Sequence, residues 1–220
     1  MLLSFDVEDG AIEEHDRWHT HEHLPERLSI PGFRRGTRWI ATGGSPRYMV
    51  VYEVESLATL ASEAYLARLN NPTPWTTKMM PHYRGMTRGL CAVVASFGFG
   101  QGGTAALIRF SPEASRSTSL VNWLTGEALP AIAQRAGLGS AHLLRGAQAA
   151  SMTNEQRIRG ADRGVDHAII VTGYEGNAVE ARAMELCGQG GLPDRGAGDV
   201  NCATYQCSYS LASSELGPLA

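Results

Sequence analysis

The sequence has few cysteines, and their spacing forms no recognisable motif. Four occur in 220 residues, with no C-x-x-C pair and no finger-like spacing with histidine. A disulfide framework and a zinc finger are therefore excluded as the features that organise the chain. Free cysteine behaves mainly as a small apolar side chain, so we expect four buried or inert thiols, Cys91, Cys187, Cys202 and Cys207.

The chain also lacks an excess of either charge and any long apolar run. It has 19 Lys and Arg against 22 Asp and Glu without a basic block, which argues against nucleic acid and anionic membranes as partners. The longest apolar stretch, LCAVVASF, has the length of a strand. The first residues, MLLSFDVEDGAIEEHD, lack the basic start and apolar segment of a signal peptide. We expect a cytoplasmic protein that binds a small molecule.

An internal repeat organises the sequence. At a shift of 105 residues, WHTHEHLP from Trp18 falls on WLTGEALP from Trp123, and LLSF from Leu2 falls on LIRF from Leu107. At the same shift PGF falls on AGL, so the match runs without a gap across a strand, a helix and a turn. We interpret this as two copies of one unit of ~100 residues. Their expected bounds are 1–100 and 104–212.

Each unit is expected to hold a strand, a helix, two strands, a helix and a strand. The strands of the first unit are LLSFDV, RGTRWIA, RYMVVYEV and LCAVVASF. The first helix follows Asp9-Gly10 and ends near Leu28, and the second, SLATLASEAYLARL, is capped by Ser56 and stopped by NNPTP. The order βαββαβ is that of a ferredoxin-like unit, with helices on one face of an antiparallel sheet. The fold class is therefore α+β.

The other face of each sheet has no helices to cover it. An apolar bare face must be buried, and two such sheets placed face to face form an α+β barrel with a cavity between them. The sequence leaves open whether the two units pair within one chain or between the chains of a homodimer.

The stretch WHTHEHLPERLSIPGF, with YMVVYE and YLARLNNPTPW after it, resembles the EthD-like branch of the dimeric α+β barrel superfamily. The resemblance covers most of the first unit and the second in outline. The superfamily includes lactone isomerases, polyketide cyclases, cofactor-independent monooxygenases, haem-dependent enzymes and non-catalytic barrels, so the fold alone does not fix the reaction.

Four of the seven histidines lie within nine residues of the first unit. In the second copy leucine, glycine and alanine stand where the first has His19, His21 and His23. The first unit is therefore expected to carry the chemistry, with the second as a degenerate wall. On a helix, His15, His19 and His23 form one stripe, and His21 lies on the opposite side.

The stripe has three possible roles. It could bind a divalent metal through His15, His19 and His23, form a solvated polar face, or supply an acid–base group without a metal. Imidazole, with a pKa of about 6.5, both takes up and returns protons near neutral pH. We favour His23 as the proton-transfer residue, with His19 and Glu22 as further catalytic candidates. In the resembling family, a histidine in such an EH-x-P stretch lies by the mouth of the cavity.

Substrate-binding candidates follow in the same unit. Arg35 and Arg38 could hold a carboxylate, although a purely solubilising role for these arginines is also open. Aromatic and polar groups could line or close the cavity, namely Tyr52, Trp75, His82 and Tyr83. Two further segments read as flexible loops: CGQGGLPDRGAG from Cys187, which lacks the strand-then-helix context of a phosphate loop, and RGAQAASMTNEQRIRGADRG from Arg145.

These residues and the resemblance together predict an isomerase that needs no cofactor. Its expected substrate is a small oxygenated, carboxylated intermediate of aromatic-compound catabolism, and it would act by general acid–base proton transfer. Cyclisation, hydrolysis and cofactor-independent oxygenation stay open as alternatives, as do a metal- or haem-dependent enzyme and a non-catalytic ligand-binding or stress-type barrel.

Overall fold

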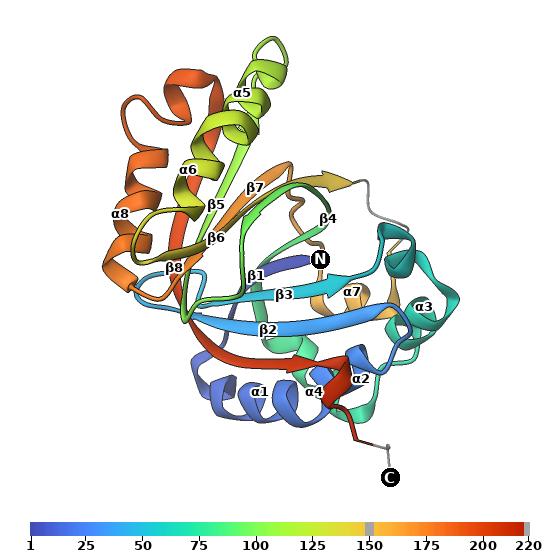
Figure 1. The fold of residues 1–220 in the computed structure, drawn as a ribbon. Helices are drawn as coiled ribbons and strands as arrows, with labels where there is room; N and C mark the ends of the chain where they lie inside the picture. Colours follow the sequence, from blue (N-terminus) through green and yellow to red (C-terminus); the bar gives the residue numbers. More distant parts are fainter. Residues whose placement is uncertain (148–151, 218–220) are drawn as a thin grey trace.

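The computed structural model describes residues 1–147 and 152–217, and its strands close into an antiparallel barrel (Figure 1). The strands are β1 (Leu2–Val7), β2 (Phe33–Ala41), β3 (Tyr48–Val54), β4 (Tyr83–Gly98), β5 (Thr104–Pro112), β6 (Leu138–Ala147), β7 (His167–Gly173) and β8 (Ala197–Ala212). Around the barrel they follow the order β1-β3-β2-β8-β5-β7-β6-β4.

The two halves of the chain contribute four neighbouring strands each. β4-β1-β3-β2 is followed around the barrel by β8-β5-β7-β6. β4 and β8 are both 16 residues long, so each pairs with its own half and then continues onto the other. β4 pairs first with β1 and then with β6, and β8 pairs with both β5 and β2. The barrel thus closes within a single chain.

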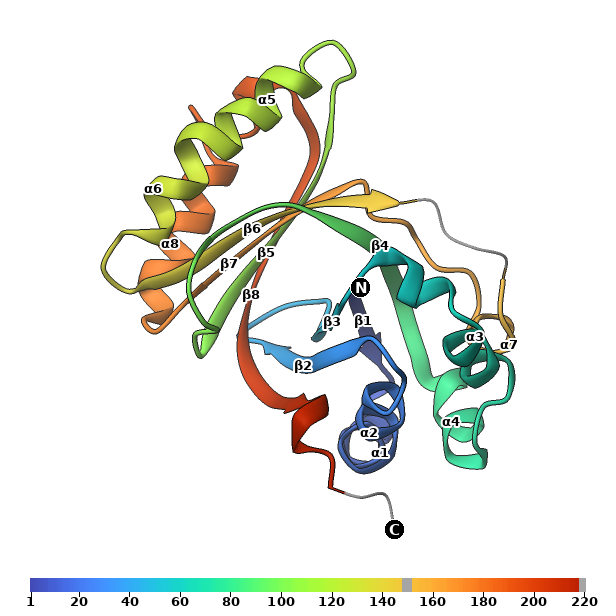
Figure 2. The same cartoon turned by 45° about the vertical axis from the view of Figure 1, so that its right-hand side comes forward.

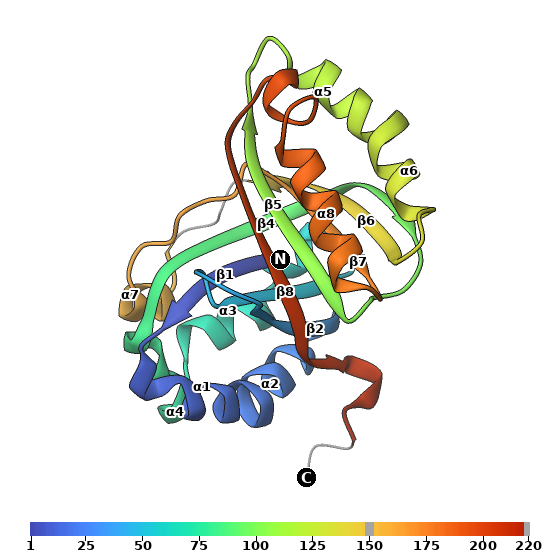
Figure 3. The same cartoon turned by 90° about the vertical axis from the view of Figure 1, so that its left-hand side faces the viewer.

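Helices cover the outside of the barrel in two groups (Figures 2 and 3). Beside the first half lie α1 (Ile12–Trp18), α2 (Leu24–Leu28), α3 (Glu63–Asn70), α4 (Pro74–Met79) and α7 (Asn154–Arg159). Beside the second half lie α5 (Ser117–Trp123), α6 (Leu129–Ala133) and α8 (Gly176–Cys187). The short helix α7 follows β6 in the chain but lies against α3 of the first half.

The sequence repeat is also a repeat of local structure. A π-helical turn, His19–His23, joins α1 to α2, and a second one, Leu124–Ala128, joins α5 to α6. In each half a proline stands at the start of the helix after this turn. Proline has no N–H for the α-helical ladder, which accounts for the local change of helix type in both halves.

The second predicted helix is shorter than expected. Leu57–Ala61 forms a 3₁₀ turn, and α3 begins only at Glu63. Ser62 is its capping residue, because its side chain accepts a hydrogen bond of 3.3 Å from the backbone N–H of Tyr65. Ser56, the predicted cap, makes no such bond.

Other sequence predictions also need correction. The last strand of the first unit begins at Tyr83, well before LCAVVASF, and the segment in front of it contains α4. In the loop predicted from Arg145, residues 148–151 lie outside the described part, and the remainder contains α7. The glycine-rich loop from Cys187 includes a 3₁₀ turn, Pro193–Arg195. Cys202 and Cys207 are exposed on β8, so the prediction of burial is wrong for them.

Apolar side chains form three clusters. Two lie between strands and helices, one in each half. The third alternates with them along the strands and therefore points into the barrel: Leu2, Trp39, Met49, Ala105, Leu107, Leu144, Ala168, Ile170 and Tyr205. Packed side chains thus occupy the space between the two sheets, where the sequence predicted a cavity. Within the described ranges, the helices are too short or too polar to cross a membrane.

Candidate functional site

The predicted histidine stripe faces the strands of the first half. The side chains of His15, His19 and His23 are 0, 2 and 8% exposed, whereas His21 is exposed on the other side of the helix. Neighbouring rings of the stripe lie 5.5 Å apart between centroids. A solvated polar face is therefore wrong as an explanation of the stripe. The three histidines lie in one row, with His21 on the other side of the helix, as their spacing predicted.

His15 is held by partners on both ring nitrogens. Its Nδ1 lies 3.2 Å from the Asp16 carboxylate, and its Nε2 lies 3.2 Å from the hydroxyl of Tyr83. Asp16 also accepts a hydrogen bond of 2.9 Å from Tyr48. Burial lowers the pKa of His15, with Asp16 acting in the opposite direction. His15 therefore links the half-exposed Asp16 to a tyrosine that lines a cavity.

His19 and His23 have no such partners. Within residues 1–147 and 152–217, the Nδ1 atom of each ring is buried without a hydrogen-bond partner. Burial holds the pKa of both well below the usual value, and positive neighbours add to the effect, Arg27 being the larger of these for His23. Both imidazoles are therefore uncharged at neutral pH, and each has one ring nitrogen without a proton.

The two rings line a cavity of about 30 Å³ between β1, β3, β4 and the helices. This is room for ordered water but not for an aromatic compound. Its walls are built by the side chains Leu3, Phe5, His19, His23, Arg27, Val50, Tyr52, Tyr65, Leu69, Met80, Tyr83, Met86, Arg88, Thr153, Glu155, Gln156 and Arg159, with Met1. The cavity thus lies outside the barrel, on the helix-covered face of the first half.

Two tyrosines give this cavity hydrogen-bonding groups. Burial raises the pKa of Tyr52 and that of Tyr83, so both hydroxyls stay protonated near neutral pH. The Tyr52 hydroxyl is buried without a partner among the described residues. It can therefore donate to an oxygen of a bound molecule.

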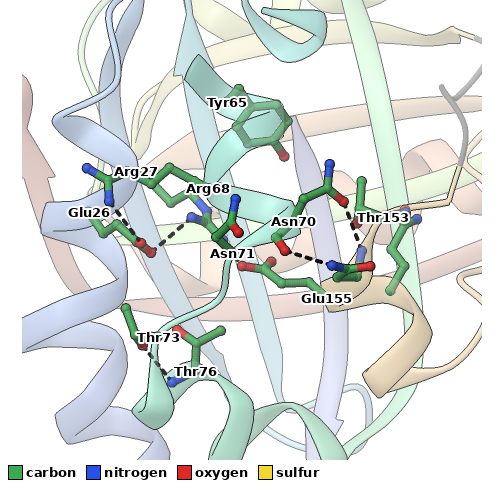
Figure 4. A network of polar contacts seen from close by, with 12 residues as sticks. Glu26, Arg27, Tyr65, Arg68, Asn70, Asn71, Thr73, Thr76, Thr153 and Glu155 are labelled. Carbon is green, nitrogen blue, oxygen red and sulfur yellow. Dashed lines mark hydrogen bonds and ion pairs between the residues drawn. The ribbon is translucent and has the colours of Figure 1, made fainter. Parts of the chain in front are cut away.

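A buried arginine completes the site and was missed in the sequence. Arg27 is 1% exposed, donates from Nη1 to Glu26 over 3.0 Å, and donates from Nη2 to Glu155. Figure 4 shows these residues between α2, α3 and α7. Arg27 lies four residues after His23, so the spacing of the stripe could have identified it. Glu155 lies in a segment predicted as a loop, and no sequence pattern placed it there.

The remaining candidates lie away from the cavity lining. Glu22 accepts hydrogen bonds from Trp18 and Thr73 and so ties the helix to the segment before α4. Of the two predicted carboxylate clamps, Arg35 is half-exposed near Glu53, and Arg38 is buried, donating to the backbone oxygen of Asp16 over 3.0 Å.

Two aromatic candidates also take surface positions. Trp75 stacks under Arg17, whose guanidinium carbon lies 5.6 Å from the ring centroid. His82 lies 2.6 Å from the Glu8 carboxylate. Of the predicted substrate-binding residues, Tyr52 and Tyr83 thus reach the cavity.

The structure gives no support to a metal site. No group of three or more His, Cys, Asp or Glu side chains in the described part of the chain is placed to hold a metal ion. The row of His15, His19 and His23 spreads along the helix instead of converging on one point. Whether the protein uses a cofactor stays a prediction.

Comparison with known proteins identifies the fold. No family model matches the chain, and neither does any curated protein. A solved structure of an anthrone oxidase-like protein matches with a TM-score of 0.63 and 13% identity, covering 97% of this chain and 93% of the other. A putative monooxygenase from Fusobacterium nucleatum matches with a TM-score of 0.58 and 8% identity, covering 96% and 92%. One from Lactobacillus acidophilus matches with 0.59 and 9%, covering 96% and 94%.

These similarities extend over nearly the whole of each chain. At such low identity they establish a shared α+β barrel fold and nothing about individual side chains. The chemistry of the site must therefore be argued from its own residues.

Proposed function

We propose that the protein is an enzyme that moves a proton within a small oxygenated compound. The observation that carries this proposal is the pair His19 and His23, which are uncharged and have no partner at Nδ1 among the described residues, in the wall of a cavity. A neutral imidazole is a proton acceptor, and burial makes the imidazolium formed from it a strong acid that returns the proton readily.

The reaction we propose is an isomerisation. A ring nitrogen of His23 takes a proton from a carbon next to a carbonyl group, and the C–H electron pair becomes the enolate. The hydroxyl of Tyr52 or Tyr83 donates a hydrogen bond to the enolate oxygen. The imidazolium then gives its proton to another carbon of the same conjugated system, so the double bond shifts and no atoms are gained or lost. The resemblance to EthD-like proteins supports an intermediate of aromatic-compound catabolism as the substrate.

Oxygenation is the second candidate, favoured by the fold shared with proteins named as an oxidase and as monooxygenases. It begins with the same proton removal. The carbanion then adds to O₂, and the proton from the imidazolium completes a hydroperoxide. Both reactions need the same base. They differ in whether the carbanion reacts with a proton or with O₂.

Hydrogen–deuterium exchange tests the shared step directly. Carbon acids such as β-keto acids, unsaturated lactones and hydroxylated aromatic ketones are incubated with the protein in D₂O, and loss of the C–H signal is followed by NMR. We expect the rate of exchange to fall at least ~100-fold in His23→Gln and by a smaller factor in His19→Gln. His21→Gln is the matched control, because it removes an exposed imidazole from the same helical turn.

The outcomes separate the candidate functions. Isomerised product without oxygen uptake supports isomerisation, and stoichiometric oxygen uptake supports oxygenation. If His23→Gln and His21→Gln behave alike, His23 is not the base. If no carbon acid exchanges but some of them bind, the protein is a ligand-binding barrel.

We also propose that the barrel consists of two tandem ferredoxin-like units, 1–100 and 104–212, and belongs to the dimeric α+β barrel superfamily, in its EthD-like branch. The repeated strand order and helix boundaries support this proposal. The second unit has Leu124 and Ala128 where the first has His19 and His23, which supports the first unit as the active half. A cytoplasmic location, the absence of a cofactor and assembly into a homodimer stay predictions.

A further inference from the structure

The wall of the cavity carries more positive than negative charge. Its charged side chains are Arg27, Arg88, Arg159 and Glu155. Arg159 is neutralised by Asp162, whose two oxygens lie 2.7 and 2.9 Å from its Nη2. Arg88 donates to the hydroxyl of Tyr65 over 3.2 Å and has no ion-pair partner in the described part of the chain. A further negative charge inside the cavity would therefore face Arg88, since Arg27 already contacts Glu26 and Glu155.

Arg27 and Glu155 form a buried ion pair between two distant parts of the chain. Their side chains are 2 and 5% exposed, and Glu155 belongs to α7, which is fixed to α3 by hydrogen bonds between Asn154 and Asn70 of 3.2 and 2.7 Å (Figure 4). A buried guanidinium is costly without a carboxylate beside it. α7 thus supplies a carboxylate to a cationic group that would otherwise be incompletely paired.

The size of the cavity sets a condition on its ligand. The space is about 30 Å³, so a larger molecule can enter only if side chains of the lining, of which Glu155 is one, move aside. Moving Glu155 away breaks the buried pair with Arg27. A ligand that brings its own carboxylate re-forms that pair, whereas a neutral ligand leaves the guanidinium with Glu26 alone and its Nη2 without a carboxylate.

We propose that the cavity selects a carboxylated ligand, whose carboxylate replaces that of Glu155 on Arg27 and also contacts Arg88. In the absence of ligand, Glu155 occupies the position of the ligand carboxylate on Arg27. It therefore competes with the ligand and lowers its affinity. This inference rests on the proposed function for the identity of the cavity as the active site. It concerns binding alone, so it can fail separately.

Calorimetric titration of the intact protein tests the proposal, with benzoate as the probe and benzamide as its neutral match. We expect Glu155→Gln to bind benzoate at least ~10-fold more tightly than the unaltered protein, because the internal competitor has lost its charge. We expect Arg88→Gln to bind benzoate ~10-fold more weakly. Arg84→Gln is the control, since Arg84 is an exposed arginine on the same strand, beside Glu8.

Several results would overturn the proposal. If Glu155→Gln gains affinity for benzamide as much as for benzoate, the substitution has only loosened α7. If Arg88→Gln and Arg84→Gln bind benzoate equally well, or if neither the unaltered protein nor Glu155→Gln binds it, the cavity does not select a carboxylate. Benzoate undergoes no reaction, so its binding does not depend on catalysis. If benzoate binds as expected but the protein catalyses no hydrogen–deuterium exchange in any carbon acid, the proposed function is contradicted and the binding proposal stands.

Discussion

His19 and His23 owe their chemical state to what surrounds them. Both rings pack against aromatic side chains, and the Trp18 ring lies 4.4 Å from that of His23 between centroids, tilted by 39°. Burial disfavours the charged form, and Arg27 adds repulsion at His23. His21, on the same helix, has an exposed side chain instead. The difference between these residues is therefore one of environment rather than of residue type.

Their lowered pKa values predict how stability depends on pH. Below pH 6.5, the ordinary pKa of histidine, His19 and His23 are protonated in the unfolded chain but stay neutral in the folded protein. The free energy of unfolding is therefore unaffected by these two groups above about pH 6.5. It falls as the pH is lowered from 6.5 toward their folded-state pKa. Each of the two histidines adds a slope of up to about 1.4 kcal/mol per pH unit to the pH dependence of the free energy of unfolding.

Urea unfolding at a series of pH values checks this prediction. We expect a double variant, His19→Gln with His23→Gln, to have a flatter profile below pH 6.5 than the unaltered protein. His21→Gln should retain the original slope. Equal slopes in all three proteins would contradict the assignment of uncharged, buried imidazoles.

The sequence predicted the histidines of the site better than its charged groups. His15, His19 and His23 share a helical period, and the second copy lacks the last two, so both period and repeat pointed to them. Arg35 and Arg38 were chosen because arginine can hold a carboxylate and because side chains alternate in direction along a strand. Strand direction instead takes one to the surface and the other to Asp16. Glu155 could not be predicted, because its contact with Arg27 spans 128 residues.

At the scale of elements, capping separates two serines that look equivalent in the sequence. Ser62 accepts a hydrogen bond from the first turn of α3, and Ser56 accepts none. We expect Ser62→Ala to lower the free energy of unfolding by about 1 kcal/mol, and Ser56→Ala to change it by less than about 0.5 kcal/mol. Thermal or urea denaturation would measure both. A larger loss in Ser56→Ala would mean that the helix starts where the sequence suggested.

Local patterns fixed most element positions but not their lengths. Apolar alternation placed β1 and β3 to within a residue, and glycine with proline ended the first helix where expected. The predicted part of β4, LCAVVASF, is the part that pairs with β6 of the opposite half. The part that escaped prediction, residues 83–89, pairs with β1 of its own half. Its sequence, YRGMTRG, has two glycines and two arginines, which are not typical of a strand. The helix α7 was missed because its stability comes from docking onto the first half rather than from its own sequence.

At the scale of the whole molecule, the barrel depends on two seams between its halves. In one of them Thr37 of β2 lies opposite Ser210 of β8, with their hydroxyl oxygens 3.1 Å apart. This spacing suits a disulfide. We expect the pair Thr37→Cys with Ser210→Cys to oxidise within one chain and to stabilise the protein by roughly 2–4 kcal/mol.

Mass spectrometry and a non-reducing gel would follow that cross-link, with Thr37→Cys alone as the control. A covalent dimer in place of a cross-linked monomer would mean that the halves pair between chains. The barrel would then be completed by a second copy.

The proposed reaction requires that the first half of the chain hold uncharged imidazole bases at the cavity. ¹⁵N NMR of the imidazole rings, recorded from pH 8 to pH 5, tests it most directly. We expect the rings of His19 and His23 to stay neutral well below pH 6.5, the pKa of a free imidazole. If both rings became protonated near pH 6.5, neither would be the buried neutral base that the proposed reaction requires.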